Sequence, residues 1–114
     1  MKIAVTSQNF RTITGHAGKT RRFLVYEAGE DAEPKEVERL DLESGMAFHD
    51  FRGDGPHPVD VADVIITGGC GQGFFHRMAA RGIRVVATAE TDPVQAVRAL
   101  LRGEPLAPPV PHEH

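Results

Sequence analysis

The chain has 114 residues, the length of one domain, with 40% hydrophobic and 25% charged positions, which are ordinary values for a globular protein. A single cysteine excludes a disulfide framework and a four-cysteine zinc site. No apolar run approaches the ~20 residues of a membrane-spanning helix, and the apolar stretch after Met1 is too short for a signal peptide. We therefore expect a protein of the reducing cytoplasm.

The formal net charge of −3 hides a strong asymmetry along the chain. Residues 1–26 carry five basic groups and no acid, whereas residues 27–43 carry eight acids and two basic groups. Residues 68–103 are positive again, with five arginines against two acids. If the two positive segments meet in space, they form a site for an anion. The acidic total argues against general nucleic-acid binding.

The first half of the chain predicts three strands and two loops. Residues 3–5 (IAV) form a short strand, and a loop rich in threonine, glycine and basic residues follows. Residues 23–27 (FLVYE) are dense in β-forming residues. Residues 36–42 have the period-two alternation of an edge strand that exposes one face to solvent. Residues 44–60 then form a long loop, with a short helical turn near 58–63, and loops of this length are typical of functional segments.

The second half predicts a strand, a glycine-rich turn, a helix and another strand. Residues 64–67 (VIIT) form a buried strand, followed at once by GGCGQG. A helix over 74–81 has its apolar side at Phe75, Met78 and Ala79 and ends at Gly82. Residues 83–87 form the last strand.

A final helix follows Asp92, which is a good N-cap, with Gln95 placed to complete a capping box. Gly103 ends this helix, and the proline-rich residues 104–114 are expected to be a disordered tail. The strand–helix–strand unit forces parallel pairing, whereas the first three strands can form an antiparallel meander. The sequence thus predicts one α/β domain over residues 1–103, with a mixed five-stranded sheet covered by helices.

The glycine-rich turn is the first candidate site. Free backbone N–H groups at a helix start attract anions, and glycines let a ligand approach the backbone closely. The turn matches neither the dinucleotide fingerprint nor the phosphate loop. A tight turn that needs glycine only for its geometry explains the pattern as well. The candidate anion-binding residues are Gly68, Gly69, Cys70, Gly71 and Gly73, with Lys19 and Arg21 from the basic loop.

Cys70 and the histidines are candidate metal ligands. A thiol near a helix N-terminus is expected to have a lowered pKa, and thiolate is a soft ligand for iron and copper. His16 lies in the basic loop, His49 and His57 in the long loop, and His76 on the helix after the turn. No pair has the spacing of a closed zinc site, so a set of His16, Cys70 and His49 would be open and incomplete.

Several segments together resemble one family: MKIAVTSQ, TGHAGK, FLVYE, DVIITGGCGQGFFHRMAARGIRVVAT and DPVQAVRALLRGEP. The chain is similar over residues 1–106 to the dinitrogenase iron–molybdenum cofactor biosynthesis family, which includes NifX, NafY and the C-terminal part of NifB. The resemblance implies a ribonuclease-H-like fold and binding of an iron–sulfur or molybdenum-containing cluster rather than turnover of a substrate. The first strand of this chain contains no acidic residue. Metal-dependent hydrolysis needs clustered carboxylates to hold the ions, so this absence counts against it.

Three functions remain open from the sequence. The favoured one is a non-enzymatic carrier of an iron–sulfur or iron–molybdenum-type cluster, with a cluster donor or acceptor protein as partner and no nucleic acid or membrane. The second is a binder of an organic anion or phosphate-bearing metabolite at the GGCGQG turn. The third is an enzyme that depends on Cys70, which requires a base within reach of the thiol.

Overall fold

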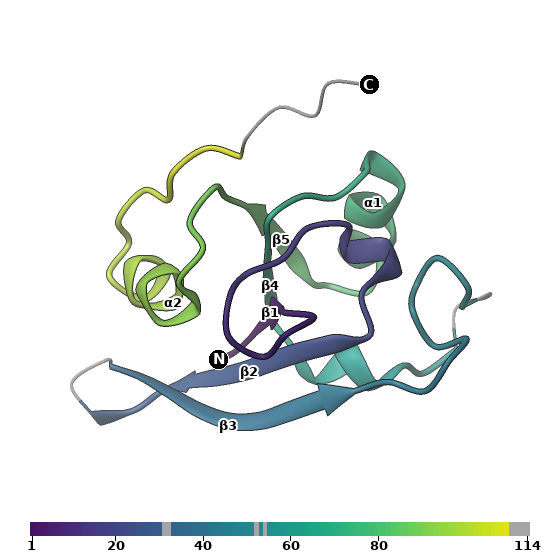
Figure 1. Ribbon diagram of the computed structural model, residues 1–114, viewed down its shortest axis with the longest axis horizontal. Coiled ribbons are helices and arrows are strands. Elements are labelled where there is room, and N and C mark those ends of the chain that lie inside the picture. Colours follow the sequence, from purple (N-terminus) through teal and green to yellow (C-terminus); the bar gives the residue numbers. More distant parts are fainter. Residues whose placement is uncertain (31–32, 52, 54, 110–114) are drawn as a thin grey trace.

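Five strands form one mixed sheet in the order β3-β2-β1-β4-β5 (Figure 1). The computed structural model describes residues 1–30, 33–51, 53 and 55–109. The strands are β1 (Lys2–Thr6), β2 (Arg22–Ala28), β3 (Pro34–Asp41), β4 (Val64–Thr67) and β5 (Arg84–Ala87). The helices are α1 (Gln72–Ala80) and α2 (Pro93–Leu101), with short 3-10 turns η1 (Ala17–Lys19) and η3 (Pro58–Val61).

The pairing of the strands follows from their connections. β1 pairs antiparallel with β2, to which residues 7–21 connect it, and β2 pairs antiparallel with β3, the next strand in the chain. β4 pairs in parallel with β1 and with β5, and the crossover from β4 to β5 contains the helix α1. In the register Ile3 lies opposite Tyr26 on one side and Val64 on the other. The predicted α/β class and the ribonuclease-H-like mixed sheet are confirmed.

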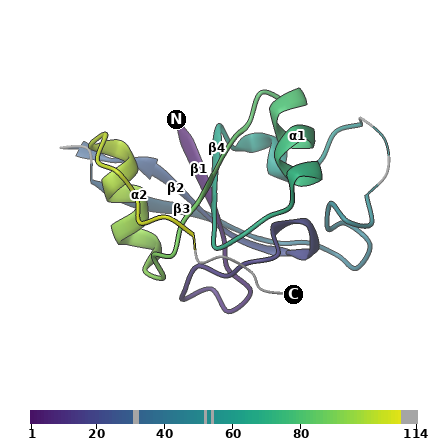
Figure 2. The same cartoon turned by 90° about the horizontal axis from the view of Figure 1, so that it is seen from above.

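The sheet buries both of its faces, and each helix covers a different one (Figure 2). Successive strand residues point to opposite faces. Ala4 and Ile65 therefore pack with Phe74 and Met78 of α1, while the intervening strand residues pack with Val97 of α2. This two-sided burial explains why β4 is apolar at every position except its last.

The apolar side predicted for the first helix is wrong at Phe75 and Ala79, which are both exposed. The helix begins at Gln72, and Phe74 and Met78, four residues apart, face the core at 7% and 0% exposure. Phe75 is 47% exposed. The sequence FF offered two choices, and the contact with Phe48 from the long loop, at 5.9 Å between ring centroids, decides for Phe74.

The N-cap of α2 is confirmed, but its capping box is not. The Asp92 carboxylate accepts from the Val94 and Gln95 backbone N–H groups at 2.9 and 3.3 Å. The Gln95 side chain accepts from Arg98 instead of returning to the cap. The backbone N–H of Asp92 donates to the carboxylate of Glu90, which takes the place predicted for Gln95.

Two further expectations differ from the structure at the edges of the domain. β3 is an edge strand, but residues 35–39 are exposed on both faces rather than one. The segment from residue 104 contacts the domain: Leu106 packs near α2, and the Ala107 carbonyl accepts from the Thr88 hydroxyl at 2.6 Å. Residues 110–114 lie outside the described part, so the division at residue 103 stays a prediction. No helix among the described residues is long and apolar enough to cross a membrane.

Candidate functional site

Three loops meet beyond the carboxyl ends of β1 and β4, which are parallel neighbours. The glycine turn (residues 68–71) leaves β4, and the N-terminal loop (residues 7–21) leaves β1. The Ala17 N–H donates to the Gly69 carbonyl at 3.0 Å, and the Gly68 N–H donates to the Thr14 carbonyl at 3.0 Å. The basic N-terminal segment therefore does fold against the turn that carries Cys70.

Gly68 is glycine because the N-terminal loop leaves no room for a side chain. A Cβ there would lie 3.2 Å from the Thr14 carbonyl carbon and 3.3 Å from the Gly15 nitrogen, both of which are backbone atoms. Two buried threonine hydroxyls complete the contact. Thr6 donates to the Thr14 carbonyl at 2.6 Å, and Thr67 accepts from the Gly69 N–H at 3.3 Å.

These contacts limit which backbone groups could bind an anion. The N–H groups of Gly68 and Gly69 already have partners within the protein. The first N–H groups of an α-helix lack intrahelical partners, so the available donors begin at the N-terminus of α1, whose N-cap is Gly71. Anion binding at this turn would therefore be a property of the helix end.

The third loop (residues 44–62) is held to α1 by an aromatic and arginine cluster. Phe48 is 2% exposed, and the guanidinium carbons of Arg77 and Arg81 lie 5.0 and 5.1 Å from its ring centroid. Arg77 also donates to the Phe48 and Phe51 carbonyls. The loop in turn reaches the N-terminal loop, because the His49 N–H donates to the Gly18 carbonyl at 2.6 Å.

His57 belongs to this cluster and is structural. Its ring stacks on Phe48 at 4.1 Å, Nδ1 accepts from the Val59 N–H at 3.0 Å, and Nε2 donates to the Met46 carbonyl at 2.6 Å. Both ring nitrogens therefore have protein partners, which fixes the neutral tautomer. Burial lowers the pKa of His57, with Arg81 acting in the same direction.

A pocket of about 410 Å³ opens beside the thiol of Cys70. Its lining consists of Cys70, Gly71, Gln72, Phe75 and His76, all from the turn and the first turns of α1. The side chain of Cys70 is half-buried against the core. Burial raises the pKa of this thiol, which is opposite to the direction expected from its place near a helix N-terminus.

His16 lines a different pocket, of about 340 Å³, together with other residues of the N-terminal loop. Its lining is Gln8, Thr14, Gly15, His16, Lys19 and Thr20. The two pockets share no residue, although their loops are in backbone contact. The structure therefore brings the predicted segments together but places His16 and Cys70 in separate hollows.

The remaining predicted residues lie at the surface. The His49 side chain is 64% exposed, and its Nδ1 lies 3.3 Å from the Asp50 carboxylate. The side chains of Lys19 and Arg21 are exposed, and the backbone N–H of Arg21 donates to Gln8. Among the described residues no group of three His, Cys, Asp or Glu side chains could hold a metal ion. A metal-containing cargo bound here would have to bring most of its ligands with it.

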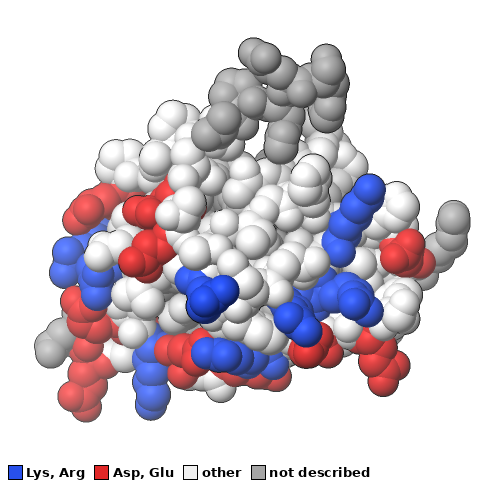
Figure 3. All heavy atoms as spheres, viewed as in Figure 1, with Lys and Arg blue, Asp and Glu red and all other residues white. Residues whose placement is uncertain are grey.

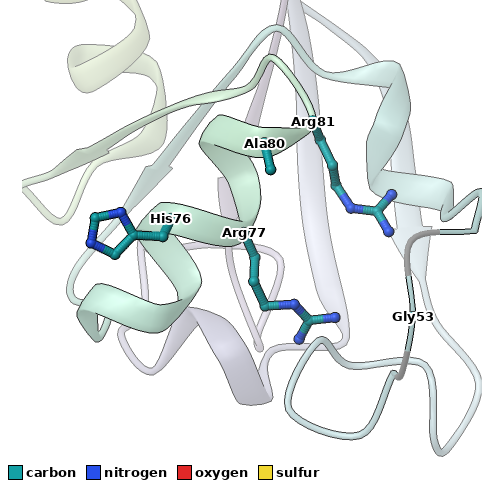
Figure 4. A pocket seen from close by; sticks show the side chains of 5 residues that line it. All are labelled: Gly53, His76, Arg77, Ala80 and Arg81. Atoms are coloured by element: carbon teal, nitrogen blue, oxygen red, sulfur yellow. The ribbon is translucent and has the colours of Figure 1, made fainter.

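His76 is the residue that sequence reasoning undervalued. It lies four residues after Gln72, and therefore on the same helix face, at the rim of the Cys70 pocket. It also borders a second hollow of about 460 Å³ with Gly53, Arg77, Ala80 and Arg81. Figure 4 shows the two arginines pointing toward the long loop and His76 pointing away from them. Cys70 precedes the helix, so helical spacing does not relate the two residues; the available signal was that His76 lies early in the helix that follows the glycine turn.

A family model described as dinitrogenase iron-molybdenum cofactor matches residues 1–103. The chain belongs to this family. Membership connects it with the binding or biosynthesis of the iron–molybdenum cofactor. No curated protein matches the sequence.

Solved structures with a similar fold include three proteins of 17–19% sequence identity. PH0822 has a TM-score of 0.69 and 19% identity, covering 91% of this chain and 93% of that chain. A protein of Methanocaldococcus jannaschii, provisionally named a dinitrogenase, has a TM-score of 0.65 and 17% identity, with coverages of 91% and 90%. A Thermotoga protein, provisionally named NifB and placed in the DUF35 family, has a TM-score of 0.55 and 18% identity, with coverages of 99% and 97%. At these identities the similarity concerns the fold.

Proposed function

We propose that this protein is a non-enzymatic carrier of an iron–sulfur or iron–molybdenum-type cluster, which it holds at the Cys70 pocket. The observation that carries the proposal is the pocket of about 410 Å³ with a thiol and an imidazole on its lining. In the described part of the chain no third possible ligand joins them. In a cluster the bridging sulfides occupy most coordination positions of each iron, whereas a bare metal ion takes its ligands from the protein and from water. An incomplete ligand set also favours release to an acceptor.

The chemistry of the two side chains suits such a cargo. Thiolate and imidazole are ligands for iron in clusters. The N-terminus of α1 offsets negative charge on the cargo, and Lys19 and Arg21 add positive charge from the adjacent loop. Within this proposal His76 is the partner of Cys70, and the predicted ligands His16 and His49 contribute from the neighbouring loops if the cargo extends beyond the pocket.

The raised pKa of the Cys70 thiol supports carriage over covalent catalysis. A nucleophilic cysteine needs thiolate at neutral pH, which a lowered pKa supplies and a raised pKa opposes. A metal ligand obtains its thiolate differently, because the metal displaces the proton on binding. Cluster uptake should therefore release a proton and strengthen as the pH rises from 6.5 to 8.5.

Anaerobic reconstitution with iron, sulfide and molybdate tests the proposal. Metal content and visible absorbance are measured for the wild type and for four variants: Cys70→Ser, His76→Ala, His16→Ala and His49→Ala. We expect Cys70→Ser to abolish uptake and His76→Ala to weaken it, with smaller effects at His16 and His49. Equal uptake by the wild type and Cys70→Ser would overturn the assignment. A large loss of uptake in His16→Ala with no loss in His76→Ala would show that the second ligand is His16 of the N-terminal loop.

A further inference from the structure

The pocket of the N-terminal loop is a second hollow with chemistry of its own. It measures about 340 Å³ and is lined by Gln8, Thr14, Gly15, His16, Lys19 and Thr20. Its lining shares no residue with the pocket beside Cys70. The lining contains no cysteine and no carboxylate.

The hydrogen bonds already formed in this pocket leave it rich in donors. The Gln8 side-chain oxygen accepts from the Arg21 N–H at 3.3 Å, so the amide N–H groups are what this side chain can offer a ligand. Thr14 Oγ1 accepts from the Gln8 N–H at 3.1 Å, which leaves the hydroxyl proton to donate. Lys19 can only donate.

The pocket also carries a positive charge, which favours an anion as hydrogen-bond donors do. Within the described part of the chain the Lys19 ammonium forms no ion pair, whereas the other lysine of the first 26 residues, Lys2, lies 3.8 Å from Glu27. Asp41, an acid of the neighbouring β3, is paired with Arg22. The charge on Lys19 is therefore not neutralised locally and is available to a ligand.

The loop that carries Gln8 and Lys19 is anchored through its backbone. Its backbone is fixed by bonds from the Ile13, Thr14 and Ala17 N–H groups to Thr91, Thr6 and Gly69 respectively. Anchoring through the backbone leaves the side chains of Gln8 and Lys19 uncommitted to the core. A preformed pocket then requires little ordering when a ligand binds.

From this combination of donors, unneutralised charge and fixed backbone we propose that the Gln8–Lys19 pocket binds a small oxyanion, a phosphate or carboxylate group. The site does not depend on the proposed cluster carriage, because it contains no group in common with the Cys70 pocket. It also differs from an anion site at the glycine turn, where two of the N–H groups are already occupied.

The test is a ¹H–¹⁵N titration of the metal-free protein with inorganic phosphate and, separately, with citrate, each at matched ionic strength in chloride. We expect saturable shifts at residues 8 and 14–20. The ratio of the two affinities tells a phosphate site from a carboxylate site. Shifts that do not saturate, or that equal those from chloride, would overturn the proposal. Shifts centred on residues 71–74 would move the anion to the N-terminus of α1 and overturn it as well.

Two variants and a control sharpen the result. Lys19→Gln should weaken binding by about tenfold, the usual effect of removing a charged hydrogen-bond donor. Gln8→Glu keeps an acceptor for the Arg21 N–H but places a negative charge in the pocket, and should abolish binding. Lys35→Gln removes an exposed lysine of β3 and should leave the affinity unchanged. Unaltered binding in both pocket variants would overturn the site. Since no iron is present, failure here leaves the cluster proposal standing, and the converse also holds.

Discussion

The two loops that flank the glycine turn are held in place by different forces. The long loop (residues 44–62) is anchored by side chains: Phe48 is buried, stacked on His57 and covered by two arginines. The N-terminal loop (residues 7–21) is anchored mainly by backbone hydrogen bonds to β1, the turn and the segment before α2. The long loop uses aromatic side chains to support the fold. The N-terminal loop buries Ile13 and Ala17 but leaves polar side chains such as that of Lys19 at the surface.

This difference indicates where binding residues can be accommodated. A loop whose side chains form the core cannot offer them to a ligand, and His57 is the example, since both of its ring nitrogens are occupied by protein groups. A loop fixed by its backbone can present polar side chains without loss of its position. The residues proposed for binding accordingly come mainly from the N-terminal loop, from the glycine turn that carries Cys70 and from the exposed face of α1.

The largest effect is expected from Phe48→Ala, which removes the centre of the long loop's anchor. Deletion of a buried phenylalanine side chain costs about 3–5 kcal/mol, so the free energy of unfolding in urea should fall by that amount. Phe75→Ala is the control, because Phe75 is 47% exposed and its truncation should change stability by less than about 0.5 kcal/mol. A similar loss in both variants would contradict the side-chain anchor.

A smaller loss is expected from Gly68→Ala, which tests the backbone anchor. The new Cβ would press on the Thr14 and Gly15 backbone at 3.2–3.3 Å, and such overpacking typically costs about 1–3 kcal/mol. Exchange of the Ala17 amide hydrogen, which bonds to Gly69, should become faster.

Gly73→Ala is the matched control for this substitution. A Cβ at Gly73 meets nothing within 4 Å, and alanine in a helix is favoured over glycine by about 0.5–1 kcal/mol. The two glycine variants should therefore shift the urea midpoint in opposite directions. Equal shifts would show that the loop and the turn do not press on each other.

The smallest effect is expected in the pH dependence of the unfolding free energy, to which His57 of the long loop contributes. Burial lowers the pKa of His57 below its ordinary value of 6.5, so the folded state favours the neutral ring. Its contribution to stability is present above pH 6.5 and is lost as the pH falls through the lower folded pKa. The unfolding free energy should therefore decline between pH 7.5 and 5, and less steeply in His57→Gln. His49→Gln, at an exposed site, should retain the wild-type slope.

The sequence was informative wherever side chains determine the structure. Apolar runs predicted β1, β2, β4 and β5, alternation predicted β3, and Asp92 predicted the start of α2, because burial and capping depend on residue type. The choice between Phe74 and Phe75 depended on Phe48, a residue 26 positions away from Phe74, so helical spacing alone could not make it.

The site was less predictable because backbone contacts carry little sequence signal. Any residue can supply the N–H of Ala17 or the carbonyl of Thr14 that join the N-terminal loop to the turn. The charge pattern indicated that the basic N-terminal loop and the glycine turn could meet, and the structure shows that they do. Charge could not show that their side chains line two separate pockets, and the pKa of Cys70 depended on how far the core buries the thiol.

The outer edge of β3 has a consequence for how the protein behaves at high concentration. An uncovered edge strand can recruit a strand of another molecule and start a fibril. Here Lys35, Glu36, Glu38 and Arg39 are exposed on this edge strand, and charged side chains are intermixed along the hairpin side of the molecule (Figure 3). Stacking of further chains would bury these charges. The protein can therefore accumulate in quantity without this edge seeding aggregation.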